Sequence, residues 1–273
     1  VMRHLSPLPL TQILNQPDLK PVAVAQVFTP LKVREVQDQH VSRLVHAKEL
    51  TDWDGREGQH DNPAELKQRK ADLDDFLRNR RAFLAADRER SAALRKTIAP
   101  GRKRICGISW RSSNAELGEH KSMALFALQP LLQQRGLRFV DLQYGDTAAE
   151  RKATAGATGT EILHIDAVDN TADLDSLAAL IDACDIIITI SNTTAHLAGA
   201  LGKEVFLMLP HAAGRLWYWQ ADRDDSLWYP RVHIVRQHRA GDWSPVVGQV
   251  CAAITAAQSP ALKAVSKKPV PKK

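Results

Sequence analysis

The first loop with residues suited to phosphate chemistry reads WRSSN over residues 110–114, followed by Gly118 and Lys121. Backbone N–H groups among small residues, together with one arginine and one lysine, are typical of a diphosphate-binding loop. The loop lacks the GxGxxG pattern, which argues against a nicotinamide dehydrogenase. An ordinary polar loop is the alternative interpretation. The candidate binding residues of this loop are Trp110, Arg111, Ser112, Ser113 and Lys121.

A second loop follows the apolar run Ile186–Ile190 and places hydroxyl and amide side chains where a helix is expected to begin. The N–H groups and dipole of a helix N-terminus favour an anion such as phosphate. His196 would lie in the first turn and donate to a phosphate or sugar hydroxyl, although a lone histidine is often structural. Ala198, Gly199 and Ala200 predict a close approach of helix to sheet. The candidates are Ser191, Asn192, Thr193, Thr194 and His196.

The third stretch, residues 210–243, holds four of the six tryptophans and several arginines. Aromatic and cationic side chains together suit stacking on a base or sugar and pairing with phosphate. Arg215 and Trp217 are candidates for the site, whereas Trp228 and Trp243 are expected in the core. Gln143, at the end of another apolar run, is expected to border the same site. The sequence shows no metal-ligand cluster and no DxD loop, so we expect no metal requirement.

The elements that must position these loops alternate in type from residue 104 onward. Short runs rich in β-branched residues alternate with amphipathic stretches, and a run such as IIITI is apolar on both faces, as in a buried parallel strand. This order predicts an α/β fold with a Rossmann-like, doubly wound parallel sheet. Ligands of such sheets bind outside the carboxyl ends of the strands. The expected strands are Arg104–Ser109, Phe139–Gln143, Glu161–Ile165, Ile186–Ile190, Val205–Leu209 and Val232–Val235; the expected helices are Ser122–Gln134, Thr147–Ala157, Asp173–Ala183 and Thr194–Leu201.

The positive charge of the chain is concentrated at one end. The 273 residues have a net charge of +6, but residues 101–257 carry 15 basic and 17 acidic side chains, while residues 258–273 carry five lysines and no acid. A nucleic-acid partner is therefore not indicated. The apolar runs are shorter than the ~18 residues that a membrane span requires. With 44% hydrophobic residues, the chain is too apolar to be wholly disordered.

The cysteines and the start of the chain suggest a location. The three cysteines form no CxxC pair, so neither a disulfide framework nor a zinc site is indicated, and a reducing compartment is favoured. Val1 is not followed by a basic-then-apolar leader, which leads us to expect a cytoplasmic protein. A start at valine also suggests that the sequence is a fragment.

The sequence divides into three regions. Residues 1–100 predict a mainly helical, irregular N-terminal region, with strongly charged helices over its last third. Residues 101–257 predict the Rossmann-like lobe. Residues 258–273, rich in proline and lysine, predict a disordered tail.

Five segments resemble one protein family in type, spacing and order. They are GISWRSSN, Lys121, FVDLQYGD, the stretch DSLAALIDACDIIITISNTTAHLAGALGKEVFLMLP, and WYWQADRDDSLWYP with RQHRAGDW. Together they resemble the C-terminal, donor-binding lobe of GT-B type bacterial glycosyltransferases associated with tetratricopeptide repeats, which are related to lipopolysaccharide heptosyltransferases. The resemblance covers about residues 104–255. Many of those relatives have Asp-Thr where this chain has Ser191-Asn192.

The resemblance implies a function for the three loops. It implies that they bind a nucleotide-diphosphate sugar, that Lys121 and His196 stabilise the leaving diphosphate, and that the sugar passes to a protein or glycan acceptor without a metal or other cofactor. It also implies a tetratricopeptide-repeat region upstream and an acceptor side that is reduced or truncated in residues 1–100. The alternatives are a sugar-nucleotide binding module without catalysis and an interaction scaffold with the same fold.

Overall fold

The structure, a computed structural model, describes residues 71–258 apart from residues 72, 73, 76, 102, 212, 221 and 222. The expected N-terminal region lies largely outside these residues, and the lysine-rich tail beyond Gln258 lies wholly outside them. Within the described part, no helix is long and apolar enough to cross a membrane.

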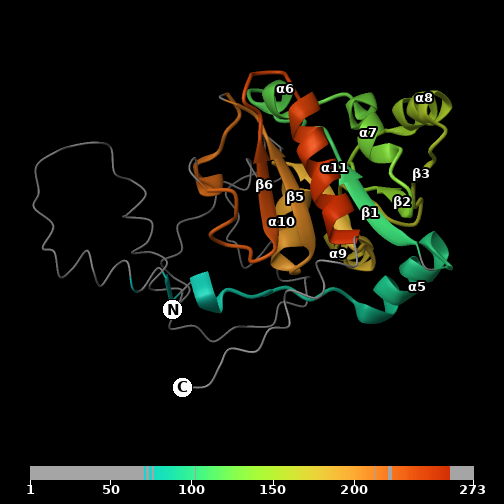
Figure 1. Cartoon of the computed structure of the whole chain (residues 1–273). Helices are drawn as coiled ribbons and strands as arrows, with labels where there is room; N and C mark the ends of the chain where they lie inside the picture. Colours follow the sequence, from blue (N-terminus) through green and yellow to red (C-terminus); the bar gives the residue numbers. More distant parts are fainter. Residues whose placement is uncertain are drawn as a thin grey trace, which may run out of the picture.

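Six parallel strands form one sheet in the order β3-β2-β1-β4-β5-β6 (Figure 1). This is the strand order of a doubly wound Rossmann fold, in which the chain starts at the centre, runs to one edge, and returns to build the other half. The α/β class predicted from the alternating pattern is confirmed. The strands are β1 Arg104–Ser109, β2 Leu137–Asp141, β3 Ile162–Leu163, β4 Ile186–Ile190, β5 Glu204–Leu209 and β6 Val232–Arg236.

Two hydrophobic layers cover the two faces of this sheet because successive strand residues point to opposite sides. Ile187 packs in the layer that holds residues of α9 and α10, whereas Ile186 and Ile188 pack in the layer that holds residues of α7 and α11. Figure 1 shows α11 crossing one face of the sheet, with α9 behind the strands. Every residue of β4 is buried, as the IIITI run predicts.

One helix, α5, precedes the sheet, and the other helices follow its strands. They are α5 Arg88–Ile98, α6 Gly118–Lys121, α7 Gln129–Leu132, α8 Ala148–Thr158, α9 Leu174–Ala183, α10 Thr193–Ala200 and α11 Ser244–Gln258, with 3-10 turns η2 Leu125–Leu128 and η3 Trp217–Trp219. Asp87, Asp173 and Asn192 cap α5, α9 and α10 through side-chain oxygens that accept from backbone N–H groups of the first turn.

Three expected elements differ in the structure. The strand expected over Phe139–Gln143 is β2, which spans Leu137–Asp141, so Gln143 lies beyond its end. The single helix expected over Ser122–Gln134 is wrong: α6 ends at Lys121, and η2 and α7 follow as separate short pieces. Pro130 stands in the first turn of α7, a position that proline tolerates, but inside one long helix it would remove a hydrogen bond and clash with the preceding turn. The strand expected over Glu161–Ile165 shortens to the two residues of β3, which pair with Phe139 and Val140.

Candidate functional site

The loops singled out in the sequence leave the sheet at its switch point. The strand β1 lies between β2 and β4, and strand order reverses between β1 and β4. The first loop follows β1, and the second loop follows β4 into α10. In an open α/β sheet, ligands bind outside the carboxyl ends of the strands at this reversal. The topology therefore brings the first two candidate loops to one edge of the sheet.

A buried polar network ties the carboxyl ends of β1, β2 and β4 together. The amide Nδ2 of Asn192 donates to Ser109 Oγ at 2.6 Å, and its Oδ1 accepts from Thr189 Oγ1 at 3.0 Å. The Oε1 of Gln143 accepts from Ser109 Oγ at 3.2 Å and from the N–H groups of Trp110 and Arg111 at 2.9 and 2.8 Å. Asn192 and Gln143 use their side-chain oxygens in these bonds. The two residues therefore hold the loops in place.

Hydrogen bonds and one glycine also fix the shape of the first loop. The N–H of Ser112 donates to Ser122 Oγ at 2.9 Å, and that of Ser113 donates to the Tyr144 hydroxyl. A Cβ at Gly118 would lie 2.5 Å from the carbonyl oxygen of Ser112, so only glycine lets the loop close on itself there. Trp110 is fully buried, and among the described residues its indole N–H has no hydrogen-bond partner.

Lys121 is the most unusual charged group at this edge. Its side chain lies at the end of α6 and the residue is only 3% exposed. Among the described residues, no hydrogen-bond acceptor or carboxylate pairs with its ammonium, and burial lowers the pKa of Lys121. The loop after β5 packs against it, since a Cβ at Gly214 would lie 2.8 Å from Lys121 Cγ. A buried ammonium without a counter-charge costs folding free energy, and an anionic ligand would offset that cost.

His196 lies in α10 among aromatic rings. Its ring stacks on Trp219 with a centroid distance of 4.8 Å, and it packs against Tyr218 in a T-shaped arrangement with a centroid distance of 5.1 Å. Its Nδ1 is 3.0 Å from the hydroxyl of Tyr229. Burial, together with the nearby charge of Lys121, lowers the pKa of His196 to about 4. The imidazole is therefore neutral near pH 7, and the charge of Lys121 adds to the effect of burial in keeping it so.

Ser191 joins the second loop to the aromatic stretch. The Nε1 of Trp219 donates to Ser191 Oγ at 2.8 Å, and both residues are buried. Burial raises the pKa of Tyr218 to about 12, although a hydrogen bond with Ser191 acts in the opposite direction. The turn η3, which begins at Trp217, is thus fastened to the start of α10 through Trp219.

Other candidates occupy different surroundings. Arg111 forms an ion pair with Glu150 at 3.4 Å and donates to the carbonyl of Asp146 at 3.0 Å. Arg215 is exposed, and its guanidinium donates to the carbonyl of His211 in its own loop at 3.0 Å. Arg215 is therefore not brought into the Lys121–His196 group. Trp217 occupies η3, Thr194 is buried at the start of α10, and Thr193 is half-buried there.

Sequence reasoning missed two groups of residues. Trp219 and Tyr229, which hold His196, belong to the aromatic-rich stretch, but nothing in their spacing distinguishes them from neighbouring aromatics. The buried carboxylate of Asp141 pairs with Arg151 at 3.2 Å and with Nδ1 of His164 at 3.0 Å. The signal for Asp141 was present, because a carboxylate at the end of an apolar strand run needs a partner.

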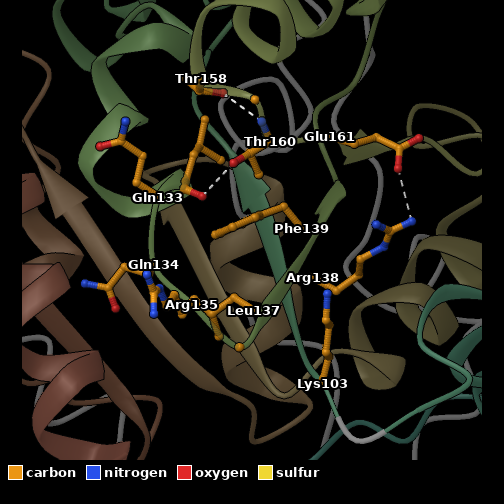
Figure 2. Close-up of a pocket in the computed structure, with 13 residues that line it drawn as sticks. Lys103, Gln133, Gln134, Arg135, Leu137, Arg138, Phe139, Thr158, Thr160 and Glu161 are labelled. Carbon is orange, nitrogen blue, oxygen red and sulfur yellow. Dashed lines mark hydrogen bonds and ion pairs between the residues drawn. The ribbon is translucent and has the colours of Figure 1, made fainter.

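A separate hollow lies at the opposite edge of the sheet. It has a volume of about 550 Å³, and residues at the amino ends of β1 and β2 and the end of α8 line it, Lys103, Arg135 and Thr160 among them (Figure 2). Figure 2 also shows the ion pair of Arg138 with Glu161, 3.1 Å long. None of the candidate residues borders this hollow. Among the described residues, no group of three or more His, Cys, Asp or Glu could hold a metal ion.

Comparisons with known proteins give one clear sequence relative. No family model matches the chain. Protein FlbA of Caulobacter vibrioides is 34% identical over 179 residues, which make up 64% of this chain and 29% of that protein. The chain thus spans under a third of the length of the curated relative it matches.

Three solved structures are similar at 10–15% identity. ADP-heptose LPS heptosyltransferase II of E. coli has a TM-score of 0.46, with 64% of this chain and 54% of that chain covered. The family 9 glycosyl transferase of Veillonella parvula gives 0.42, with 57% and 43% covered. E. coli heptosyltransferase WaaC, solved with ADP-2-deoxy-2-fluoro heptose, gives 0.36, with 81% and 55% covered. All three TM-scores lie below 0.5.

Proposed function

We propose that the carboxyl edge between β1 and β4 binds the diphosphate of a nucleotide-sugar donor, and that the protein is a glycosyltransferase that passes the sugar to a protein or glycan acceptor. The observation that carries this proposal is Lys121, a residue only 3% exposed whose ammonium has neither a carboxylate nor a hydrogen-bond partner among the described residues. A diphosphate would supply the missing negative charge.

The surroundings of Lys121 support an anionic ligand. The N-terminus of α10 carries a positive partial charge from the helix dipole, and Asn192 caps it. The charge of Lys121 acts on His196 in this helix and lowers its pKa, which supports a shared site. The site would offer one full positive charge, on Lys121, together with a helix N-terminus and a neutral histidine donor. A single charge suits an anion that must be released after each turnover.

Sugar transfer from such a donor requires stabilisation of the departing diphosphate as negative charge develops on it. Lys121 would do so by charge and His196 by a hydrogen bond, both pre-positioned by the fold. Transfer also requires a base that deprotonates the acceptor hydroxyl. The family resemblance assigns that base to the acceptor side. Transfer without a metal, a cytoplasmic location and an upstream tetratricopeptide-repeat region stay predictions of the sequence.

A panel of nucleoside diphosphates and their hexose and heptose conjugates tests the proposal. We expect at least one member to raise the melting temperature of the full chain and to release free nucleoside diphosphate when an acceptor extract is added. Replacing Lys121 by Met should abolish the shift. The matched control is Lys203→Met, because Lys203 is a paired lysine that donates to the carbonyl of Asp182 at 2.7 Å, beyond the opposite end of α10.

Each outcome of this panel has one interpretation. If a nucleotide sugar raises the melting temperature but no acceptor leads to release of free nucleoside diphosphate, the binding module is favoured over the enzyme. If no member raises the melting temperature at millimolar concentration, the nucleotide-sugar site is wrong and the interaction scaffold is favoured.

A further inference from the structure

Tyr229 contacts His196 from a segment more than 30 positions further along the chain. Its ring lies against α10 at Gly199, where a Cβ would stand only 2.5 Å from the ring carbon Cγ of Tyr229. Its hydroxyl is 3.0 Å from His196 Nδ1, and among the described residues the hydroxyl has no other hydrogen-bond partner. The fold thus directs one phenol group at one nitrogen of the candidate site.

The direction of this hydrogen bond follows from the protonation of both partners. Burial raises the pKa of Tyr229 above its usual value, so the phenol keeps its proton, and the lowered pKa of His196 leaves only one proton on the imidazole. If Nδ1 carried that proton, it would donate to the phenol oxygen, and the phenol proton would have no acceptor among the described residues, which is costly. The favoured arrangement has Tyr229 donating to Nδ1, with the ring proton on Nε2.

We propose that Tyr229 is a positioning residue, whose hydroxyl fixes His196 as the Nε2–H tautomer and so provides an uncharged N–H donor to an oxygen of the bound diphosphate. This inference rests on the proposed function for the identity of the ligand, but the tautomer itself does not depend on it. The remaining ring nitrogen, Nε2, has no hydrogen-bond partner among the described residues and is therefore available to a ligand.

The arrangement divides two tasks between neighbouring side chains. Lys121 supplies positive charge, and its field disfavours a second cation on His196. A neutral histidine avoids that repulsion and still offers a directional donor, but only if the proton stands on the nitrogen that faces the ligand. A neutral imidazole left to itself exchanges its proton between both nitrogens, so a fixed partner at Nδ1 is needed. Among the described residues, the titratable groups that act on or contact the imidazole are Lys121, Tyr218 and Tyr229.

The tautomer can be measured on the full chain without any ligand. Long-range ¹H–¹⁵N spectra of histidine-labelled protein at pH 7 should show His196 with an unprotonated Nδ1 and a protonated Nε2; the spectrum of His196→Asn identifies its signals among the ten histidines. In Tyr229→Phe, which keeps the ring against Gly199, we expect a mixture of both tautomers. Tyr218→Phe removes the hydroxyl of another ring that packs on the same imidazole and should leave the tautomer unchanged. A wild-type His196 protonated at Nδ1 would overturn the proposal without reference to any variant.

Binding of inorganic pyrophosphate separates this inference from the proposed function. Loss of one positioned hydrogen bond predicts an affinity about three- to tenfold weaker for Tyr229→Phe than for wild type. If wild type does not bind pyrophosphate while its tautomer is as expected, the proposed ligand is wrong and the role of Tyr229 in fixing His196 stands. If Tyr229→Phe changes the tautomer but binds pyrophosphate as wild type does, His196 does not donate to the ligand and the proposal fails.

Discussion

At the residue scale, the site rests on two side chains that burial affects in different ways. Lys121 keeps a long aliphatic stem against the loop after β5 and has an ammonium without a counter-charge among the described residues, whereas His196 is stacked on Trp219 and stays neutral. Both groups are costly for the folded chain when they are charged, since burial disfavours the charged form. Two such groups support the binding site that we propose at this edge of the sheet.

The pKa of His196 predicts how stability depends on pH. The folded-state pKa of about 4 lies below the usual 6.5, so the unfolded chain binds more protons between these values. The stabilisation is fully present above pH 6.5 and is lost as pH falls toward 4. Since one pKa unit corresponds to about 1.4 kcal/mol, the loss approaches about 3 kcal/mol. Urea unfolding of wild type and His196→Gln from pH 4 to 7 measures the difference; parallel curves for both proteins would contradict the assignment.

At the scale of the element, the packing of α10 depends on Gly199, which has no side chain. The sequence predicted that Gly199 allows a close helix–sheet approach, but the nearest atoms to a Cβ at Gly199 all belong to Tyr229. The glycine therefore makes room for the ring whose hydroxyl contacts His196. Sequence periodicity identifies α10 and its small residues, but it does not show which distant aromatic fills the space, because that depends on the path of the chain after β5.

Gly199→Ala is expected to destabilise the protein although alanine is the better helix former. The added methyl group would overlap the ring of Tyr229, and such overpacking costs about 1–3 kcal/mol. The control is Gly156→Ala in α8, where a Cβ would meet no atom within 4 Å; there we expect a gain of about 0.5–1 kcal/mol. Chemical denaturation of both variants gives the comparison. Equal gains in both would show that Tyr229 does not lie against α10.

Much of the architecture could be predicted from the hydrophobic pattern of the sequence, and the exceptions have physical causes. The bounds of β1 and β4 are as expected because fully buried parallel strands give continuous apolar runs. The helix expected after Ser122 breaks because of Pro130. At the site, the loops after β1 and β4 were identified correctly as neighbours because topology places all strand ends at one edge. The side-chain partners of Gln143 and His196 depend on tertiary contacts that no local pattern encodes.

At the scale of the whole molecule, residues 80–84 fasten the segment before α5 to the lobe. The N–H groups of Phe83 and Leu84 both donate to the carbonyl of Ala200, at 3.0 and 3.1 Å. Phe83 stacks on Tyr229 with a centroid distance of 6.1 Å, and Arg80 pairs with Asp225 at 2.8 Å and donates to the carbonyl of Ser226. The segment that leads in from the N-terminal region therefore touches the residue proposed to position His196.

Arg80→Met should loosen this attachment. Arg80 is 16% exposed and bonds to two acceptors, so its loss predicts a cost of about 1–2 kcal/mol and faster hydrogen exchange at the Phe83 and Leu84 amides. The matched control is Arg78→Met, because the Arg78–Asp75 pair is exposed and worth little. Mass-spectrometric hydrogen exchange over residues 80–87 reports the effect. Unchanged protection in Arg80→Met would contradict the role assigned to this arginine.

The most direct test of the central claim is calorimetric titration of inorganic pyrophosphate into wild type, Lys121→Met and Lys203→Met, paired with the unfolding free energy of each. If Lys121 is a buried cation kept for an anion, Lys121→Met loses at least tenfold in affinity while its unfolding free energy rises by about 1 kcal/mol or more. Lys203→Met, which removes a lysine paired with Asp182, keeps the affinity of wild type. Wild-type affinity in Lys121→Met would contradict the account, because the site would then bind its anion without the charge on which the proposal rests.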